Sequence, residues 1–496
     1  MISPGLLNTG EAVARINISV DLLGTISHEL ATVHDARLAD LFGEVTDNES
    51  LMLRVVYAFD RVGRYVVVEA EFDGERYPSL SDFDPAAFVE ECELYEQFGV
   101  TPENDKRLNR LLAPPHQGDR VVAGARQERT RSKRKYEPHV VSGEAFEFPF
   151  GPVRAAGWES LYMGLVTTGE EVLDLYLMPW HKRRGLERLL VGRDPDRASF
   201  LVERVEGLCA VGNTLAFSRA VETATGLEVP GAVQRTRCLA LELERIYNHV
   251  AAIAATCQAT GLSVGQARVE LVLEQLLRLN AAVFGHRYLF GVICPGGVLR
   301  DANTTDLQPT LAAILAELRG VIDGLLHTNS YMDRLEATGI VTPEKAKALS
   351  LVGPVARAAG QDLDVRRDHP TSRDEAGPGR VPVGEEGDAL ARIRVMVQEI
   401  QEAAALVDSH SSRTGAGRLE IPAISGEGLG WAETPRGETL VWVALDDQGR
   451  VRFARVRPGS ARNWRAFDDA ARARNVFTDI PIIEASFWLT VAGYAR

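Results

Sequence analysis

The first part of the chain alternates apolar and polar residues in a pattern that predicts a hairpin followed by a helix. Leu51–Phe59 and Arg64–Phe72 are rich in β-branched and aromatic residues and are separated by Asp60-Arg-Val-Gly63, which is typical of two antiparallel strands. A helical spacing follows over residues 87–97 and ends at Gly99. Residues 1 to about 120 are therefore expected to form a small α+β unit.

Further along, apolar residues recur at intervals of three and four over long stretches. Residues 233–259, 269–287 and 311–335 each keep this spacing and predict long helices that pack as a bundle. Residues 362–387 are rich in charge, proline and glycine and predict a long mobile loop. The other predicted elements are a helix at 389–407 and hairpins at 159–168 with 171–179 and at 439–445 with 450–457.

Composition narrows the class of protein. The chain has 496 residues, a net charge of −14 and five cysteines, none of them two or three residues apart. This spacing argues against a disulfide framework and against an all-cysteine zinc or iron–sulfur site, and it favours the reducing cytoplasm. The acidic charge disfavours binding to nucleic acid. No signal peptide and no run of 18 apolar residues is seen, so we expect any membrane attachment to come through partner subunits.

One segment departs from the acidic balance. Residues 125–135 carry six basic residues against one acid. Such a run is typical of a solvated linker between domains. The alternative is a site that docks on an acidic partner.

A polar stripe interrupts the helix expected at 233–259. Cys238, Glu242, Arg245 and His249 are spaced by four, three and four residues and so share one face. Charges buried on such a face must be paired. The stripe therefore predicts a structural ion-pair network to neighbouring helices or, alternatively, a charge or proton path near a redox site.

Two glycine-rich turns, Gly285-His-Arg-Tyr288 and Cys294-Pro-Gly-Gly-Val298, match neither a P-loop nor a dinucleotide fingerprint. His286 and Arg287 are candidates for lining a cleft or for capping a helix. Motifs of serine hydrolases and zinc enzymes are missing from the sequence.

The segment Glu206-Gly-Leu-Cys209 has the spacing of a Cys-x-x-Cys metal site, but a carboxylate stands at its first position. In its context the chain resembles the large subunit of membrane-bound nickel–iron hydrogenases of the hydrogenase-4 and formate-hydrogenlyase type, and the related quinone-site subunit of respiratory complex I. The segment Glu91-Cys-Glu-Leu-Tyr-Glu-Gln-Phe-Gly99 is similar to the small peripheral-arm subunit of complex I. The motifs that carry the main resemblance are residues 201–222, Lys182-Arg-Arg-Gly-Leu-Glu187, Glu242-Leu-Glu-Arg-Ile-Tyr-Asn-His249, Gly285-His-Arg-Tyr288, Pro295-Gly-Gly-Val298, Gly426-Glu-Gly-Leu-Gly-Trp-Ala-Glu-Thr-Pro-Arg-Gly-Glu438 and Ser486-Phe487.

The resemblance implies an α+β fold in which a small N-terminal α/β sandwich domain precedes a hydrogenase-large-subunit-like domain. The second domain is expected to contain a central bundle of long helices and peripheral β-hairpins. The implied boundaries are residues 1–120 for the small-subunit-like domain, 121–145 for a basic linker and 146–496 for the large-subunit-like domain.

The departures from the family change the expected chemistry. Such hydrogenases hold nickel and iron with two Cys-x-x-Cys pairs; the early pair corresponds to Glu206 and Cys209, and the late pair falls at about Thr490 and Gly493. Three of the four thiolates are missing, so we expect the nickel–iron centre to be absent and the chain to bind no metal.

The quinone-binding His and Tyr of the complex I subunit are also replaced, by Ala156 and Gly207. The residues left for the cavity are Glu206, Cys209, Arg154 and Arg183, which form either a proton-handling or anion-binding centre or a salt bridge that plugs the vacated metal site.

The resemblance thus implies an oxidoreductase subunit of a complex-I-like, NADH-quinone-oxidoreductase-like complex, with NAD binding implied by the family alone. The implied partners are an iron–sulfur small subunit carrying a [4Fe–4S] cluster, a ferredoxin-like subunit and antiporter-like integral membrane subunits. The expected location is the cytoplasmic side of the plasma membrane, and the expected acceptor is a quinone or another compound. The alternative is a cofactor-free structural subunit that joins the peripheral and membrane arms.

Overall fold

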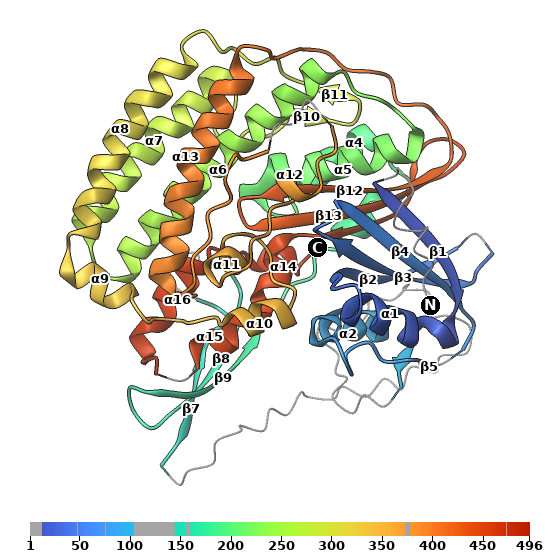
Figure 1. The fold of residues 1–496 in the computed structure, drawn as a ribbon, viewed down its shortest axis with the longest axis horizontal. Helices are drawn as coiled ribbons and strands as arrows, with labels where there is room; N and C mark the ends of the chain where they lie inside the picture. Colours follow the sequence, from blue (N-terminus) through green and yellow to red (C-terminus); the bar gives the residue numbers. More distant parts are fainter. Residues whose placement is uncertain are drawn as a thin grey trace.

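The computed structural model describes residues 12–46, 48–74, 76–103, 144–154, 159–372, 377–472 and 474–496. A helical bundle occupies one side of the molecule and two sheets meet at the other (Figure 1). The mixed α+β class with an N-terminal sheet domain and a C-terminal helical domain is confirmed. The basic segment 125–135, most of the linker expected at 121–145, and Ala156 lie outside the described residues.

The N-terminal domain is a four-stranded sheet in the order β1-β4-β3-β2, in which β1 and β4 are parallel and the other pairs antiparallel. The hairpin predicted at Leu51–Phe59 and Arg64–Phe72 is confirmed. Gly99 ends the predicted helix in the left-handed conformation, with φ of 74°. The elements of this domain are β1 (Val13–Ser19), α1 (Leu23–Thr32), β2 (Arg37–Val45), β3 (Leu51–Phe59), β4 (Arg64–Phe72), β5 (Arg76–Tyr77), α2 (Phe88–Phe98) and β6 (Thr101–Pro102).

Four long helices form the bundle: α6 (Gly231–Ala259), α7 (Ser263–Phe284), α8 (Leu307–Leu326) and α13 (Ala389–Ser411). The predicted helices at 233–259 and 389–407 match α6 and α13 closely. The helix predicted at 269–287 begins earlier and ends at Phe284, because Gly285 adopts a left-handed conformation. The single helix predicted at 311–335 is wrong: α8 ends at Leu326, and α9 (Asn329–Leu335) starts after a break.

The expectation of a mobile loop at 362–387 is wrong for its first residues. The short helix α12 (Val365–Asp368) forms there, and Asp364, Val365 and His369 are buried. Arg366 and His369 of this segment are held by ion pairs to distant parts of the chain, which local composition cannot reveal.

A three-stranded antiparallel sheet of β12 (Gly426–Thr434), β13 (Gly437–Leu445) and β14 (Val451–Arg457) lies in the middle of the molecule. Helix α5 (Ala210–Thr225) packs directly on β12. A Cβ atom added at Gly426, Gly428 or Gly430 would lie 2.0–2.1 Å from a backbone oxygen of α5. Since alternate residues of a strand share one face, these three glycines form a groove in which the helix backbone rests.

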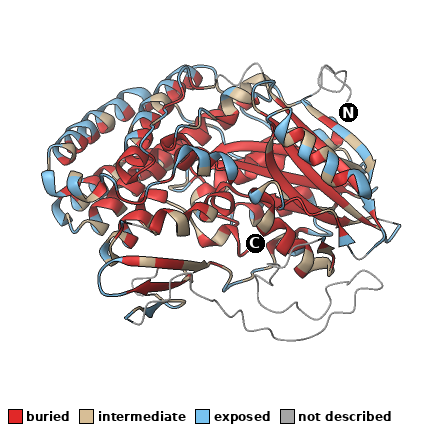
Figure 2. Ribbon diagram, turned by 60° about the horizontal axis from the view of Figure 1, so that its bottom comes forward, coloured by how far each residue is buried: buried red, intermediate tan, exposed pale blue. Residues whose placement is uncertain are grey.

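The opposite face of this sheet packs on the N-terminal domain. Leu429, Trp431 and Trp442 share one core cluster with Phe42 and Tyr65 of the N-terminal sheet. The strands at this junction are largely buried (Figure 2). The central sheet is therefore a shared layer, with α5 on one side and the N-terminal sheet on the other.

Buried ion pairs reinforce the domain junction. Arg455 on β14 donates to both carboxylate oxygens of Asp40, each at 3.1 Å, and to Glu93 at 2.7 Å. Glu438 on β13 accepts from Arg37 of the N-terminal domain at 2.7 Å and from Arg457 at 2.8 Å. The two domains are thus joined by hydrophobic contacts and by charges that are shielded from water.

A peripheral sheet, β7-β8-β9, projects at the bottom of Figure 1, and the hairpin predicted at 159–179 is confirmed by β8 and β9. The hairpin predicted at 439–457 is confirmed by β13 and β14. The other elements of the second domain are β7 (Phe146–Phe150), β8 (Tyr162–Thr167), β9 (Val172–Met178), α3 (Leu186–Leu190), α4 (Pro195–Val202), β10 (Ile293–Cys294), β11 (Gly297–Val298), α10 (Pro343–Ala348), α11 (Gly353–Ala358), α14 (Gly459–Asn463), α15 (Phe467–Ala471) and α16 (Ile480–Phe487).

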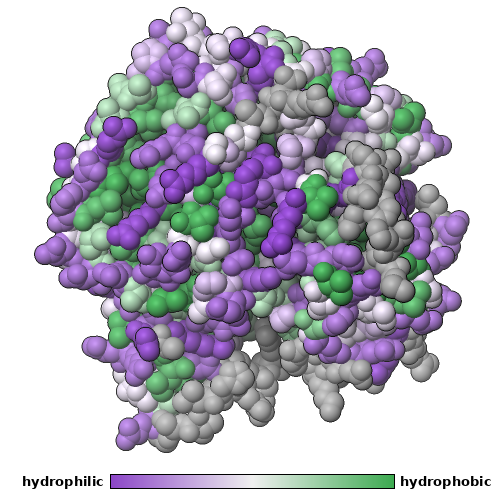
Figure 3. Space-filling model, in the orientation of Figure 1, coloured by the Kyte–Doolittle hydropathy of each residue, from purple (hydrophilic) through white to green (hydrophobic). Residues whose placement is uncertain are grey.

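On the face shown in Figure 3, hydrophobic residues gather mainly over the helical bundle and are crossed by rows of hydrophilic side chains. Within the described residues, none of the helices combines the length and the apolar character that a membrane span requires.

We predict that Gly428→Ala destabilises the protein, because the new Cβ would lie 2.1 Å from the carbonyl oxygen of Ala220 and force α5 away from β12. The free energy of unfolding should fall by about 1–3 kcal/mol or more. Urea denaturation followed by circular dichroism measures this change.

Gly320→Ala is the matched control. Gly320 lies inside α8, where an added Cβ meets no atom within 4 Å, so the same substitution should raise stability by about 0.5–1 kcal/mol. Equal effects of the two substitutions would contradict the close packing of α5 on β12.

Candidate functional site

The early and late segments expected to carry metal ligands meet in space. Glu206 is fully buried in the turn before the 3₁₀ segment Gly207–Cys209, and α5 begins at Ala210. A Cβ added at Gly493 would lie 2.7 Å from Oε1 of Glu206. The two positions are far apart in sequence, yet the glutamate carboxylate lies against the Gly493 backbone.

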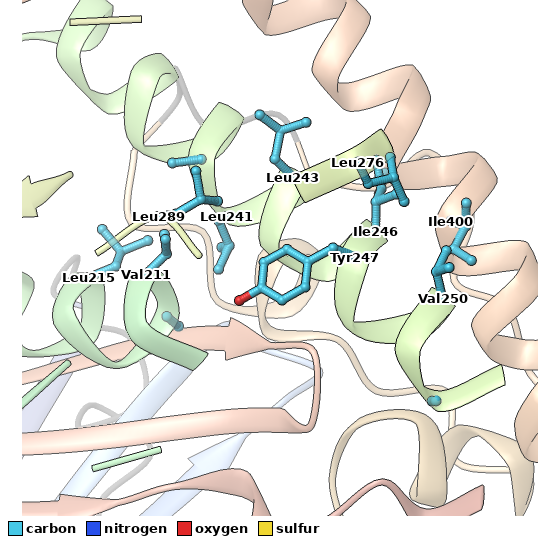
Figure 4. Close-up of a cluster of buried hydrophobic side chains, with 14 of the residues drawn as sticks. Val211, Leu215, Leu241, Leu243, Ile246, Tyr247, Val250, Leu276, Leu289 and Ile400 are labelled. Atoms are coloured by element: carbon cyan, nitrogen blue, oxygen red, sulfur yellow. The ribbon is translucent and has the colours of Figure 1, made fainter. Parts of the chain in front are cut away.

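The start of α5 is held from behind by α6. Glu244 accepts the backbone N–H groups of Val211 at 2.7 Å and Gly212 at 2.9 Å. Burial raises the pKa of Glu244 to about 8, while these two hydrogen bonds oppose the rise. Tyr247 projects from α6 toward the same helix start (Figure 4), and its hydroxyl donates to the Leu208 carbonyl at 3.1 Å. These contacts set the position of Cys209.

Cys209 has a charged neighbour that the sequence motifs do not single out. Nη1 of Arg436 lies 2.9 Å from its Sγ atom, and Nε of Arg436 donates to the Trp488 carbonyl at 2.6 Å. Burial raises the pKa of the Cys209 thiol far above its ordinary value, although Arg436 opposes this rise. The group is therefore a neutral thiol at physiological pH rather than a ready thiolate.

Glu206 is also shifted toward its protonated form. Burial is the largest cause of its raised pKa; the nearby Arg436, Ser460 and Cys209 side chains oppose it, and the charge of Glu159 adds to it. Among the described residues, neither carboxylate oxygen has a hydrogen-bond partner at good geometry in spite of these neighbours. A buried carboxyl with so few partners favours the neutral state.

Arg154, expected near Glu206, pairs with Glu484 instead. Its Nη1 atom lies 2.8 Å from each carboxylate oxygen of Glu484, and its Nε donates to the Glu159 carbonyl at 2.9 Å. The carboxylate of Glu159 in turn accepts from Thr490 Oγ1 and the Val491 backbone N–H, both at 2.6 Å. Arg154 and Glu159 thus fix the C-terminal segment that faces Glu206.

Arg183 is partly exposed, and in the described part of the chain it makes no ion pair or hydrogen bond with these groups. The neighbouring Arg184 takes the place expected for it. Nη2 of Arg184 donates to the carbonyls of Val205 and Ala492, both at 2.7 Å. Burial lowers the pKa of Arg184, and the charges of Glu159 and Glu206 oppose this shift. Arg184 therefore ties the Glu206 turn to the C-terminal segment.

A cavity of about 520 Å³ lies beside this site. Arg436 belongs both to its wall and to the contact with Cys209. Its walls combine aromatic and charged side chains, among them Tyr288, Phe290, Trp488, Arg154, Glu159, Arg436 and Glu484.

His286 and Arg287 stay outside this lining. Arg287 pairs with Glu274 at 2.6 Å, and Nδ1 of His286 accepts the backbone N–H of Tyr288 at 3.2 Å. They shape the turn that carries Tyr288 and Phe290, which line the cavity in their place.

The polar stripe of α6 enters a second site, which we call the buried charge cluster. Arg245 donates to Glu242 at 3.0 Å, and His249 Nε2 lies 2.8 Å from Glu399. Cys238 lines a small cavity next to Glu242. The cluster consists of Glu242, Arg245, His249, Arg357, Asp364, Arg366, Glu399 and Glu433, contributed by α6, α11, α12 and its N-cap, α13 and β12.

The cluster is an ion-pair network between helices. This is the first of the two interpretations given above for the polar stripe. Arg357 bridges Glu399 at 2.7 Å and Glu433 at 2.9 Å, and Arg366 bridges Asp364 and Glu242. Arg245 donates to the backbone carbonyls of Glu433 and Thr434. The β12–β13 turn therefore joins the two sites, because Glu433 belongs to the cluster and Arg436 to the Cys209 site.

Three family models match the chain in succession. Residues 20–120 match the 30 kDa subunit of respiratory-chain NADH dehydrogenase, residues 184–253 match nickel-dependent hydrogenases, and residues 272–424 match the 49 kDa subunit of respiratory-chain NADH dehydrogenase.

Individual relatives come from the same kinds of enzyme. The chain is 28% identical to formate hydrogenlyase subunit 5 of Escherichia coli (strain K12), over 85% of this chain and 78% of the relative. It is 26% identical to hydrogenase-4 component G of the same organism, over 95% and 86% of the two chains. It is also 26% identical to an NADH-quinone oxidoreductase subunit of Citrifermentans bemidjiense, over 69% and 97%.

A solved structure shares the fold. The structure of the membrane-bound sulfane sulfur reductase, an archaeal respiratory membrane complex, contains a chain that matches with a TM-score of 0.66 at 23% identity, over 72% of this chain and 100% of that one. The chain is therefore homologous to hydrogenase-4 and formate hydrogenlyase subunits and to this NADH-quinone oxidoreductase subunit, and it fuses the 30 kDa and 49 kDa domains of complex I in one polypeptide.

Proposed function

We propose that this chain is a subunit of a complex-I-like membrane redox complex in which a protonatable site replaces the nickel–iron centre. The observation that carries the proposal is the contact of the Glu206 carboxylate with the Gly493 backbone. A carboxyl group and a glycine occupy two positions where hydrogenases of this family have cysteine.

The residues present do not fit a nickel–iron centre. Nickel in such a site requires several thiolates, whereas the four corresponding positions hold Glu206, Cys209, Thr490 and Gly493. The remaining thiol has a strongly raised pKa and lies 2.9 Å from a guanidinium group, and a positive charge at that distance repels a metal cation. No step of the proposed mechanism passes through a metal in this chain.

The site suits proton handling next to an electron acceptor. The adjoining cavity offers aromatic walls for a flat ring and two cationic groups. Arg154 is paired with Glu484, which leaves Arg436 for a carbonyl or anionic oxygen. A quinone has both features, and its reduction takes up two electrons and two protons. Glu206, whose raised pKa favours the protonated form, would supply one of the two protons as Arg436 stabilises the developing negative charge, and water would supply the other and reprotonate Glu206.

The electrons would come from a partner. We propose an iron–sulfur small subunit with a [4Fe–4S] cluster, a ferredoxin-like subunit and antiporter-like membrane subunits, with the complex on the cytoplasmic side of the plasma membrane. The names of the relatives support this arrangement: they are subunits or components of larger enzymes, and the solved structure is that of a respiratory membrane complex.

A structural role is the second candidate. Glu206 and Cys209 are fully buried beside Arg436, and this arrangement would also suit a plug that fills the vacated metal position. In that case the chain would join the peripheral and membrane arms and catalyse nothing.

Glu206→Gln distinguishes the two candidates. The complex is reduced with dithionite, the dithionite is removed, and a short-chain ubiquinone is added. The rate of reoxidation is then read from the absorbance of the iron–sulfur clusters. We predict that this rate falls by about 100-fold in the variant, which is the size of effect expected when a proton donor is lost. The subunit composition should stay intact. Glu270→Gln on the exposed side of α7 is the control and should leave the rate unchanged. A wild-type rate in the Glu206 variant would support the structural role.

The stability of Glu206→Gln should depend on pH in a defined direction. The pKa of Glu206 is raised in the folded protein, so the wild type loses stability as the pH rises from the ordinary glutamate pKa through the raised value. Glutamine escapes this loss, and the melting temperature of the variant minus that of the wild type should grow with pH. A difference that falls with pH would indicate a stabilising salt bridge to Arg436.

A further inference from the structure

The buried charge cluster contains more acids than bases. Three guanidinium groups, those of Arg245, Arg357 and Arg366, face four carboxylates, and all these side chains are at most 8% exposed. Burial is the largest of the causes that lower the pKa of His249, so its imidazole does not balance the charge. Arg219, which lines the adjoining cavity, is only half-buried and lies outside these ion pairs. A net buried charge costs several kcal/mol, and the cluster therefore favours binding one proton.

Glu433 is the acid that fits this proton. Burial and the nearby Asp364 carboxylate raise its pKa to about 7, against the opposing effect of Arg357, Arg245 and Arg366. Glu399 and Glu242 instead have lowered pKa values because burial is outweighed by their arginine partners. Glu433 lies at the end of β12 and is fully enclosed, so any proton it exchanges needs a path.

A small cavity of about 30 Å³ adjoins Glu433. Its volume can hold a water molecule, and its polar lining offers the partners that a buried water needs. Besides Glu433 the lining includes Arg219 of α5, Cys238 and Glu242 of α6, Arg366 of α12, and His369.

His369 connects this cavity to the N-terminal domain. The residue is 1% exposed, its Nε2 atom lies 2.9 Å from Oδ1 of Asp60, and its ring stacks on Tyr65 with centroids 4.3 Å apart. Among the described residues, the other ring nitrogen, Nδ1, has no hydrogen-bond partner. A buried polar nitrogen in that state is unfavourable, and water in the adjoining cavity would satisfy it.

Asp60 completes the connection to solvent. It follows β3 and lines a groove of about 960 Å³ between the two domains, together with Arg37 and Asp368. Its side chain is 15% exposed and is held by Arg37 at 3.0 Å. The carboxylate thus has one side toward the groove and one oxygen on His369.

We propose that Asp60, His369 and Glu433 form a proton relay that connects the interdomain groove with the buried charge cluster. Burial would raise the pKa of Asp60, but Arg37 and His369 outweigh it and lower that pKa, so Asp60 holds the proton only in passing. It takes a proton from solvent and delivers it to Nε2 of the His369 tautomer that carries its own proton on Nδ1. The imidazole releases its other proton from Nδ1 to water in the small cavity, and that water protonates Glu433. Each group returns to its starting state when the imidazole tautomer reverses, so the step is a net movement of one proton. That this proton then serves the Glu206 site rests on the proposed function, whereas the relay itself does not.

The test follows hydrogen–deuterium exchange of the Glu433 acid proton by infrared spectroscopy of the full-length protein. At a pH about one unit below its pKa, Glu433 should give a carboxylic-acid band, which Glu433→Gln removes. On transfer to D₂O, this band should shift at least about tenfold more slowly in Asp60→Asn and His369→Ala than in the wild type. Loss of a positioned proton carrier slows proton transfer by at least about this factor.

Asp40→Asn is the matched control. Asp40 is also a carboxylate at the domain junction held by an arginine, Arg455, but it lies outside the cavity linings named above. The Glu433 proton should exchange in this variant as fast as in the wild type. In His369→Ala, added imidazole should restore fast exchange of the Glu433 proton.

The relay would be overturned if His369→Ala exchanged as fast as the wild type, or if Asp40→Asn slowed exchange equally. It would also be overturned if imidazole failed to restore exchange, or if the acid band survived in Glu433→Gln. Because the measurement needs no turnover, its failure is distinct from failure of the proposed redox function.

Discussion

The close contact of α5 with β12 is the constraint on which the rest of this structure depends. Glycine at 426, 428 and 430 lets the strand approach the helix to backbone distance, a separation at which any side chain would collide. Cys209 precedes the first turn of that helix, and Arg436 follows the end of that strand. The helix–strand packing therefore determines where thiol and guanidinium meet, and it leaves little freedom to either.

The same strand connects the two domains. The glycine face of β12 receives α5, and the alternate residues Leu429 and Trp431 pack on the N-terminal sheet. Arg455 and Glu438 add charge pairs that are buried and hydrogen-bonded. Such pairs contribute less to net stability than to specificity, since a misaligned junction would leave charges unpaired in a dry interface.

Elements with a clear local period could be predicted from the sequence. The hairpin of Leu51–Phe59 and Arg64–Phe72 and the helix α6 appear where alternation and helical spacing place them. The break between α8 and α9 could not be predicted because the apolar spacing continues across it. The buried start of the 362–387 segment could not be predicted either, because its charges are paired by residues that are distant in sequence.

The candidate site, too, could be predicted only in part from the sequence. Motif spacing places Glu206 and Cys209 together and aligns Gly493 with them, but it cannot choose between the adjacent Arg183 and Arg184, or assign Arg154 to Glu484. Arg436 and Glu159 escape prediction because their partners lie far away in the chain. A usable signal exists in Gly426-Glu-Gly-Leu-Gly430, whose alternate glycines indicate a strand pressed against another backbone.

The central claim is that a protonatable group, Glu206, has taken the place of a metal centre within a redox complex. The most direct test is the iron and nickel content of the complex that copurifies from membranes with this chain. We expect iron from iron–sulfur partner subunits and no nickel. Stoichiometric nickel would contradict the role assigned to Glu206, and a complete set of partners without iron would leave only the structural role.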